Sequence, residues 1–294
     1  MKTRKIVRFV QDFIFKSLEL DYRFISRSPF MTFLEKFKFL YIKYKLISHY
    51  IIFRRFNFGL SKVKLFGNDF YYNHGLAGIG GLQASLIQHI NLFKKVELNT
   101  SPILIDVGAN VGNVSYWFLK TFHNSSVFAI EPGQVCFGVL EKNLSVFDKS
   151  RIKLFNSLCS SESNKLLNFG TNDKESSLSK IIDVQGKVTH KANNLVKSTT
   201  LDSLLENENL SHIDILKIDT EGHELEVLLG SQSVLRKVGY LHIELNQSEY
   251  AIGDLFNLLQ NNGMKIELID IRVFHKSQGH IKSADLFLKL TKIN

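Results

Sequence analysis

The chain has 294 residues, 44% of them hydrophobic and 22% charged, a composition that excludes a disordered or fibrous protein. Its two cysteines, Cys136 and Cys159, exclude a disulfide framework and predict a reducing compartment, which we take to be the cytoplasm. The first 64 residues hold fifteen Lys or Arg and four Asp or Glu, a net charge of +11, whereas the remaining 22 basic and 24 acidic residues give −2, so the whole basic excess is N-terminal.

The N-terminal residues 1–58 place apolar side chains at helical spacing. In the second half of this segment Phe33, Phe37, Leu40 and Tyr44 share one helical face, with lysines around them. No run approaches the roughly 18 apolar residues of a membrane span, and charged residues interrupt any signal peptide. We therefore predict a basic helical extension over residues 1–62. Residues 1–58 suit peripheral contact with a membrane surface or an anionic glycan, and a solvated helical face is the alternative.

The next two segments lead into the main domain, which we predict over residues 63–294. Residues 63–72 alternate in a way that predicts a hairpin turning at residues 67–69. A glycine-rich stretch follows at residues 74–82. We interpret it as a loop before a helix at 82–94, and a lid over a ligand is the alternative.

From residue 101 onward, predicted strands alternate with predicted helices. Seven strands are expected, at residues 103–107, 127–130, 152–155, 213–218, 240–245, 265–270 and 284–290. Helices are expected between the earlier ones, at residues 112–122, 135–147, 222–229 and 251–261. This alternation predicts an α/β fold, a parallel sheet with helices on both faces. The last two strands have no helix between them and predict an antiparallel hairpin, and residues 160–198 predict an insertion with short strands.

The segment ILIDVGANVGNVS, residues 103–115, combines an apolar strand, a glycine turn and a helix start. Asp106, Gly108, Asn110 and Gly112 form the pattern D-x-G-x-N-x-G. A dinucleotide-binding turn would have glycine at the position of Asp106, where a carboxylate repels pyrophosphate. S-adenosylmethionine is cationic and carries no phosphate, so this turn favours it as the cofactor and disfavours a nicotinamide oxidoreductase.

Polar residues also follow the other predicted strands. Glu131 is placed to accept hydrogen bonds from ribose hydroxyls, and Ser157 lies where adenine is expected. Asp219 and Glu221 follow the fourth strand, and Glu244 lies at the end of the fifth. Each has a local alternative, since acids stabilise helix starts and serines occur in turns.

Metal binding has little support in the sequence. Asp219, Glu221 and Glu244 have ligand types that suit a hard divalent cation. No His or Cys spacing marks a metal site, however, and we interpret His223 and His242 as structural. No metal is therefore predicted.

Several of these segments together resemble a known family. LIDVGANVGNVS, FAIEP, TLDSLL, DILKIDTEGHELEVLLG and YLHIELN are similar to the FkbM-type S-adenosylmethionine-dependent methyltransferases, over residues 100–260. The resemblance implies a Rossmann-like class I methyltransferase sheet of seven strands with the last one antiparallel. It carries over Asp106, Gly108, Asn110, Gly112 and Glu131 as cofactor-binding residues, and Asp219 and Glu221 as a signature near the substrate.

The function predicted on this basis is O-methylation of a sugar, glycolipid or other small acceptor. Asp219 is the first candidate for the general base, followed by Glu221 and Glu244. One alternative is a non-catalytic protein that binds S-adenosylmethionine or acts as a scaffold. A nucleic-acid methyltransferase is disfavoured because the predicted catalytic domain is slightly acidic.

Overall fold

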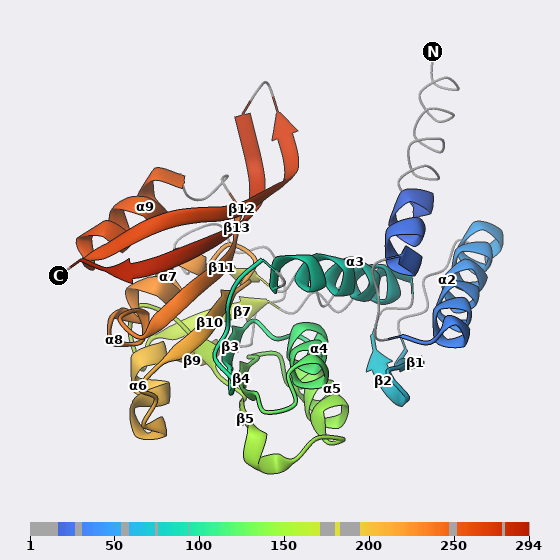
Figure 1. Ribbon diagram of the computed structural model, residues 1–294, viewed down its shortest axis with the longest axis horizontal. Coiled ribbons are helices and arrows are strands. Elements are labelled where there is room, and N and C mark those ends of the chain that lie inside the picture. Colours follow the sequence, from blue (N-terminus) through green and yellow to red (C-terminus); the bar gives the residue numbers. More distant parts are fainter. Residues whose placement is uncertain are drawn as a thin grey trace. The chain divides into compact units, whose positions relative to one another are not determined.

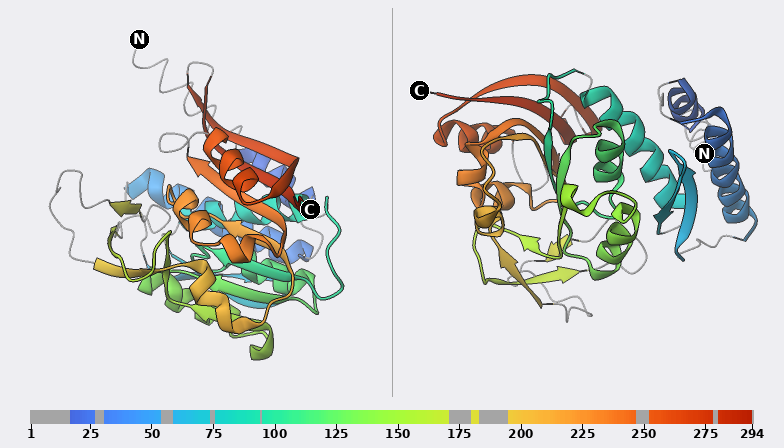
Figure 2. Two further views of the ribbon diagram at one scale, coloured as in Figure 1. Left: turned by 90° about the vertical axis from the view of Figure 1, so that its left-hand side faces the viewer. Right: turned by 60° about the horizontal axis from the view of Figure 1, so that its bottom comes forward.

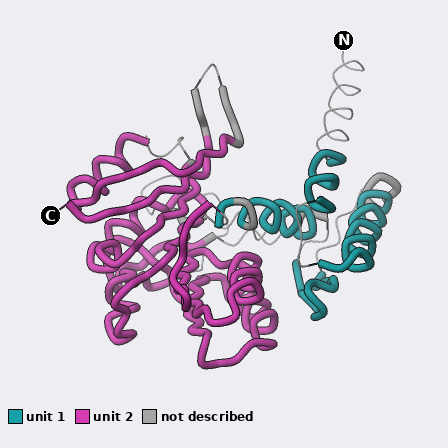
Figure 3. The backbone as a smooth tube through the Cα atoms, in the orientation of Figure 1, with its two compact units in different colours: residues 1–94 teal, residues 95–294 magenta. Residues whose placement is uncertain are grey.

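The computed structural model describes residues 17–26, 31–53, 59–73, 76–93, 95–170, 180–182, 195–246, 252–277 and 280–293 (Figures 1 and 2). The chain forms two compact units, residues 1–94 and residues 95–294 (Figure 3). Each unit is described by itself.

The first unit is built from helices and one hairpin. Residues 17–26 are helical, α2 spans Phe33–Phe53 and α3 spans Leu76–Phe93. Strands β1 (Ser61–Leu65) and β2 (Asn68–Tyr72) pair antiparallel, which confirms the predicted hairpin. Its turn residues, Phe66 and Gly67, have φ values of 51° and 83°, the left-handed conformations that a tight hairpin turn requires. None of the helices in the described part of the chain is both long and apolar enough to cross a bilayer.

The domain boundary at 62/63 stays a prediction. In the structure the hairpin packs against α2 within the first compact unit, and Val63, Leu65 and Phe70 are buried. The glycine-rich stretch, predicted as a loop, is mostly helix. Gly78 lies in α3, and only glycine fits there because a Cβ would lie 1.9 Å from the backbone oxygen of Asn73.

The second unit is organised around a seven-stranded sheet. The strand order is β12-β13-β11-β10-β3-β4-β5. The bounds are β3 Ile103–Val107, β4 Ser126–Ile130, β5 Ile152–Phe155, β10 Ile213–Ile218, β11 Val238–Asn246, β12 Met264–Ser277 and β13 His280–Lys292. Strands β5, β4, β3, β10 and β11 are parallel, and β13 inserts antiparallel between β11 and β12. The predicted seven strands and their terminal hairpin are confirmed.

Helices cover both faces of this sheet. Helices α4 (Asn113–Thr121) and α5 (Gln134–Leu144) lie on one face, and α6 (Leu201–Leu205), α7 (Glu224–Leu229) and α8 (Gln232–Leu235) lie on the other (Figures 1 and 2). Helix α9 (Ile252–Asn261) packs against β12. All six residues of β10 are buried, as expected for a central strand of a covered sheet.

The region predicted as an insertion forms a second, smaller sheet. Its strand order is β6-β9-β7-β8, with bounds β6 Leu158–Cys159, β7 Leu166–Gly170, β8 Lys180–Ile182 and β9 Leu195–Thr199. Leu158, Leu167 and Phe169 form its buried apolar cluster. This sheet adds an apolar wall beside the carboxyl ends of β3 and β4.

Candidate active site

A cavity opens at the carboxyl ends of β3, β4 and β10, the place where open α/β sheets bind ligands. The space that it offers to water-sized molecules is about 160 Å³. The lining residues are Val107, Gly108, Asn110, Ile130, Glu131, Pro132, Ser157, Leu158, Cys159, Phe169, Asp219, Thr220, Glu221 and His223.

The glycine turn after β3 is shaped by two close contacts. Gly108 has φ +76°, and a Cβ built there would lie 1.8 Å from the backbone oxygen of Asp219. Gly112, with φ +87°, precedes α4, and its Cβ would lie 2.7 Å from the Leu140 side chain of α5. The first glycine thus permits the approach of β10, and the second permits packing of α4 on α5.

The Glu131 side chain joins this turn to the end of β4. Its two carboxylate oxygens accept hydrogen bonds from the backbone N–H groups of Asn110, at 2.9 Å, and Gly133, at 2.8 Å. The residue is 8% exposed, and burial raises the pKa of its carboxyl to about 7 despite the two hydrogen bonds. Each oxygen retains a lone pair, so the carboxylate can accept further bonds from a ligand in the cavity.

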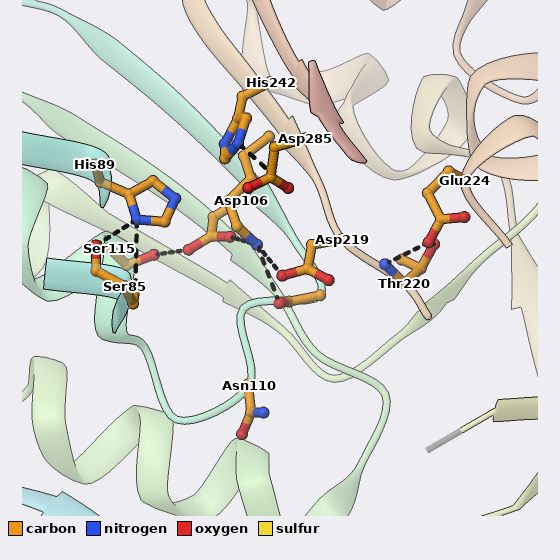
Figure 4. Close-up of polar contacts among 12 residues, drawn as sticks. Ser85, His89, Asp106, Asn110, Ser115, Asp219, Thr220, Glu224, His242 and Asp285 are labelled. Atoms are coloured by element: carbon orange, nitrogen blue, oxygen red, sulfur yellow. Dashed lines mark hydrogen bonds and ion pairs between the residues drawn. The ribbon is translucent and has the colours of Figure 1, made fainter. Parts of the chain in front are cut away.

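The buried ammonium group of Lys217 links strand β10 to strand β3. The Lys217 ammonium on β10 lies 3.1 Å from Asp106 Oδ1 and 3.4 Å from Asp219 Oδ2, and it donates to the Gly108 carbonyl at 3.4 Å. Burial would lower the pKa of Lys217, but the two carboxylates outweigh it and hold the pKa above its usual range. Ser115 donates to the other oxygen of Asp106 at 2.7 Å (Figure 4). Asp106 is fully buried, so its charge faces Lys217 and not the cavity.

The loop after β10 is held by a residue from the helix that follows it. Glu224 Oε1 accepts from the backbone N–H groups of Thr220, at 3.0 Å, and Gly222, at 2.8 Å (Figure 4 shows Thr220). Burial raises the pKa of Glu224 despite these bonds. Between these two residues, Glu221 has φ 55°, an unusual conformation for a residue with a side chain. The bonds to Glu224 therefore stabilise a strained loop that carries two acids at the cavity wall.

Two further lining residues contribute no charge. His223 Nε2 lies 3.0 Å from the Ser160 hydroxyl, and burial lowers the pKa of the imidazole. Burial raises the pKa of the Cys159 thiol to about 12, so it stays protonated at neutral pH. Among the described lining residues, the charged side chains are therefore carboxylates.

Glu244 lies near this site but outside the cavity lining. Its carboxyl is strongly desolvated and also faces the charges of Asp219, Asp285 and Glu221, and these effects raise its pKa well above the usual range. It therefore carries a proton at neutral pH. His242 on the same strand is buried, with Nε2 3.9 Å from Asp285 Oδ1 (Figure 4).

The structure gathers most of the predicted site residues at one cavity. The residues that line it are Gly108, Asn110, Glu131, Ser157, Asp219 and Glu221. Asp106, Gly112 and Glu244 lie outside its lining. Lys217 and Glu224 were not predicted, although a lysine inside an apolar strand and an acid two residues after Gly222 were visible signals. In the described part of the chain, no group of three or more His, Cys, Asp or Glu side chains is placed to hold a metal ion.

Several features of the cavity are compatible with S-adenosylmethionine. The buried Glu131 carboxylate offers free lone pairs for ribose hydroxyls. Pro132, Leu158 and Phe169 form an apolar part of the lining, and the turn at Gly108 also borders the cavity. Asp219, one-third exposed, places a negative charge where a cationic ligand would be attracted.

The fold and this site define a class I methyltransferase domain. The model of the methyltransferase FkbM domain matches residues 106–266, more than half of the chain, and the chain belongs to this family. The predicted family and methyltransferase class are confirmed, with S-adenosylmethionine as the cofactor of the domain.

Three relatives from other organisms share part of this sequence. The chain is 30% identical over 159 residues to methyltransferase sdnD of Sordaria araneosa, covering 45% of this chain and 61% of that protein. It is 24% identical over 191 residues to 2-O-methyltransferase NoeI of Sinorhizobium fredii, and the match covers 60% of this chain and 76% of that protein. It is 28% identical over 150 residues to hexuronic acid methyltransferase AglP of Haloferax volcanii, and the match covers 51% of this chain and 58% of that protein. The match thus spans less than two thirds of sdnD and of AglP.

Solved structures with a similar arrangement are more distant. Precorrin-6y C5,15-methyltransferase from Geobacter metallireducens is 15% identical, with a TM-score of 0.40, and the match covers 69% of this chain and 87% of that one. TrmK of M. capricolum, solved with S-adenosylhomocysteine, is 11% identical with a TM-score of 0.43, and the match covers 70% and 69%.

Proposed function

We propose that this protein transfers a methyl group from S-adenosylmethionine to a hydroxyl oxygen of a sugar, glycolipid or other small acceptor. The observation that carries the proposal is the opening of Glu131, from β4, and Asp219 and Glu221, after β10, into one cavity. One relative is named a 2-O-methyltransferase and another a hexuronic acid methyltransferase, which supports oxygen as the acceptor atom and a sugar as the acceptor class.

The cofactor, when bound, supplies an activated methyl group on a sulfonium centre. The chain has to align the acceptor oxygen and receive its proton as the new oxygen–carbon bond forms and the sulfur–carbon bond breaks. Glu131 would hold the ribose and the Leu158–Phe169 wall the adenine. The acceptor then approaches from the side of Asp219 and Glu221.

We assign the proton-accepting role to Asp219, with Glu221 second. The Asp219 carboxylate reaches the cavity, and the nearby Lys217 ammonium at 3.4 Å balances its charge. Glu244, the third predicted candidate, carries a proton at neutral pH and cannot accept another. It therefore acts as a neighbour of the site in this proposal.

The charges of the cavity indicate which sugars fit. On the acceptor side, the described lining holds two carboxylates, Asp219 and Glu221, and a neutral histidine, with no Lys or Arg. A uronate would face like charges, whereas a neutral or amine-bearing sugar would not. We propose a neutral or amino sugar as the acceptor, in contrast to the hexuronic acid in the name of AglP.

The compartment and partners follow from the same features. We place the reaction in the cytoplasm, and the two buried cysteine thiols, Cys136 and Cys159, support a reducing compartment. Nucleic acid is a poor candidate partner for this cavity because its described lining carries no basic side chain.

Two variants test the proposed cofactor-binding role of Glu131 and the proposed base role of Asp219 separately. Glu131→Ala should weaken S-adenosylmethionine binding in calorimetric titration, while Asp219→Asn should leave that binding within a few-fold and lower turnover by about 100-fold, as loss of a general base does. Asp254→Asn, the same chemical change on an exposed residue of α9, is the control. Unchanged turnover in Asp219→Asn would remove Asp219 as the base, and absence of cofactor binding by the folded wild type would remove the transferase itself.

The acceptor class is tested with three matched glycosides. We would measure methyl transfer to a neutral pyranoside, the corresponding amino sugar and the corresponding uronate. The uronate should have a kcat/KM at least about tenfold below the other two, because it meets two carboxylates. A uronate that reacts as well as the neutral sugar would contradict the charge argument and leave the transferase assignment intact.

A further inference from the structure

Helix α2 of the first unit carries large apolar side chains on a face that the described residues of the unit leave exposed. Phe33, Leu34, Phe37 and Tyr41 are between 62% and 76% exposed. Their spacing places them along one side of the helix over about two turns, roughly 12 Å of its length. We call these four residues the aromatic stripe. A stripe of this size is unusual on a soluble surface and marks a contact site.

The opposite side of α2 holds the helix in this orientation. Phe39 is fully buried against Phe24, with ring centroids 4.6 Å apart. The buried Lys43 ammonium lies 2.5 Å from Asp21 Oδ1, and the Gln83 amide donates to the same oxygen at 2.7 Å. Turning the stripe inward would break this buried ion pair and expose Phe39. The exposure of the stripe is therefore fixed by the packing of the unit.

The charges around the stripe are basic. Lys38 and Lys45 are exposed and seven residues apart, so they lie in one row along the helix. This row lies about 40–60° around the helix axis from Tyr41 of the stripe. The one acid of the helix, Glu35, points elsewhere, accepting hydrogen bonds from the backbone N–H groups of Thr32 and Gly67. The stripe thus lies beside positive charge, in a segment whose net charge is +11 over residues 1–64.

We infer that the aromatic stripe of α2 docks on the surface of an anionic lipid bilayer. Phe and Tyr side chains are favoured at the level of the headgroups, and a flanking lysine row adds attraction to anionic lipids. A second copy of the chain would bring two basic segments together, and their repulsion argues against self-association through this face. The inference stands on the first unit alone and does not depend on the transferase reaction.

The test uses the full chain and vesicles of phosphatidylcholine with and without phosphatidylglycerol. The wild type should co-sediment with the anionic vesicles, more weakly at high salt, and bind the neutral vesicles poorly. The triple variant Phe33→Ser, Phe37→Ser, Tyr41→Ser should lose about tenfold or more in partitioning. Lys38→Gln with Lys45→Gln should weaken binding several-fold and flatten its salt dependence.

A matched control removes exposed apolar side chains elsewhere. Val146→Ser, Leu229→Ser and Leu268→Ser alter apolar residues of the second unit that are 44–50% exposed and should leave partitioning unchanged. The inference is overturned if the stripe variant, shown by circular dichroism to be folded, binds as the wild type does. It is also overturned if the wild type ignores both kinds of vesicle, or if the stripe variant changes only the oligomeric state in gel filtration. Cofactor titration of the same proteins reports separately on the transferase domain.

Discussion

The buried ion pair between Asp106 and Lys217 allows a sharp test of how the cofactor turn is held. Lys217→Met keeps most of the side-chain volume and removes the ammonium group. Asp106 is 0% exposed and Lys217 is 3% exposed, so little water can replace the lost partner. What remains for the Asp106 carboxylate is the hydrogen bond from Ser115.

The size of the effect follows from the geometry. Unit charges 3.1 Å apart interact by about 5 kcal/mol at an effective dielectric constant of about 20. Removing one member of a buried pair costs about 3–5 kcal/mol, because the other charge is left uncompensated. We therefore expect Lys217→Met to lower the free energy of unfolding by about 4 kcal/mol at neutral pH. The double variant Asp106→Asn, Lys217→Met carries neither charge and should lie within about 1.5 kcal/mol of the wild type.

The assay is urea unfolding followed by tryptophan fluorescence. Trp117, the single tryptophan of the chain, is buried in α4 of the second unit, so the signal reports on that unit. The reasoning is refuted if the single variant stays within about 1 kcal/mol of the wild type at neutral pH, or if the double variant is no more stable than the single one.

Two further predictions concern the same turn. Burial raises the pKa of Glu131 from 4.5 to about 7, so the wild type loses stability as the pH rises through this window. Glu131→Gln does not ionise, and its unfolding free energy should therefore rise by about 3 kcal/mol relative to that of the wild type between pH 4.5 and 8. The same variant should bind the cofactor more weakly. Urea titrations across this pH range check it, and parallel curves for the two proteins would contradict it. Gly108→Ala should lower the free energy of unfolding by at least about 3 kcal/mol, because its Cβ would lie 1.8 Å from the Asp219 oxygen and its backbone is left-handed. The control Gly138→Ala, on the open face of α5, should leave the free energy of unfolding unchanged or raise it by up to about 1 kcal/mol. Equal free energies of unfolding for these two variants would contradict the prediction, because the turn would then accept a Cβ at Gly108 without loss of stability.

The sequence was sufficient for the parts of the fold that depend on local pattern. Alternating strands and helices predicted the sheet, and the carboxyl ends of parallel strands share one edge, so Glu131 and Asp219 were expected near one another. The glycine-rich start of α3 was misread because glycine disfavours helices in isolation, and the pattern does not show that Gly78 packs too closely on the Asn73 backbone for any side chain.

The electrostatic partners were harder to predict. Asp106 was expected to attract a cationic ligand, but a carboxylate inside a sheet takes its partner from a neighbouring strand, and the parallel register of β3 and β10 places Lys217 beside it. Sequence patterns show that β10 is buried but not which strand it borders. The pKa of Glu244 likewise depends on Asp285, which comes from the antiparallel strand β13.

The contact between Gly108 and Asp219 has a consequence for the order in which ligands bind. In the proposed function this turn faces the cofactor and Asp219 faces the acceptor, and the two backbones lie so close that a Cβ on Gly108 would be 1.8 Å from the Asp219 oxygen. We expect ligand binding on one side to change the affinity on the other, and by linkage the coupling is the same in both directions. A cofactor analogue should tighten the acceptor by the same factor by which the acceptor tightens the analogue.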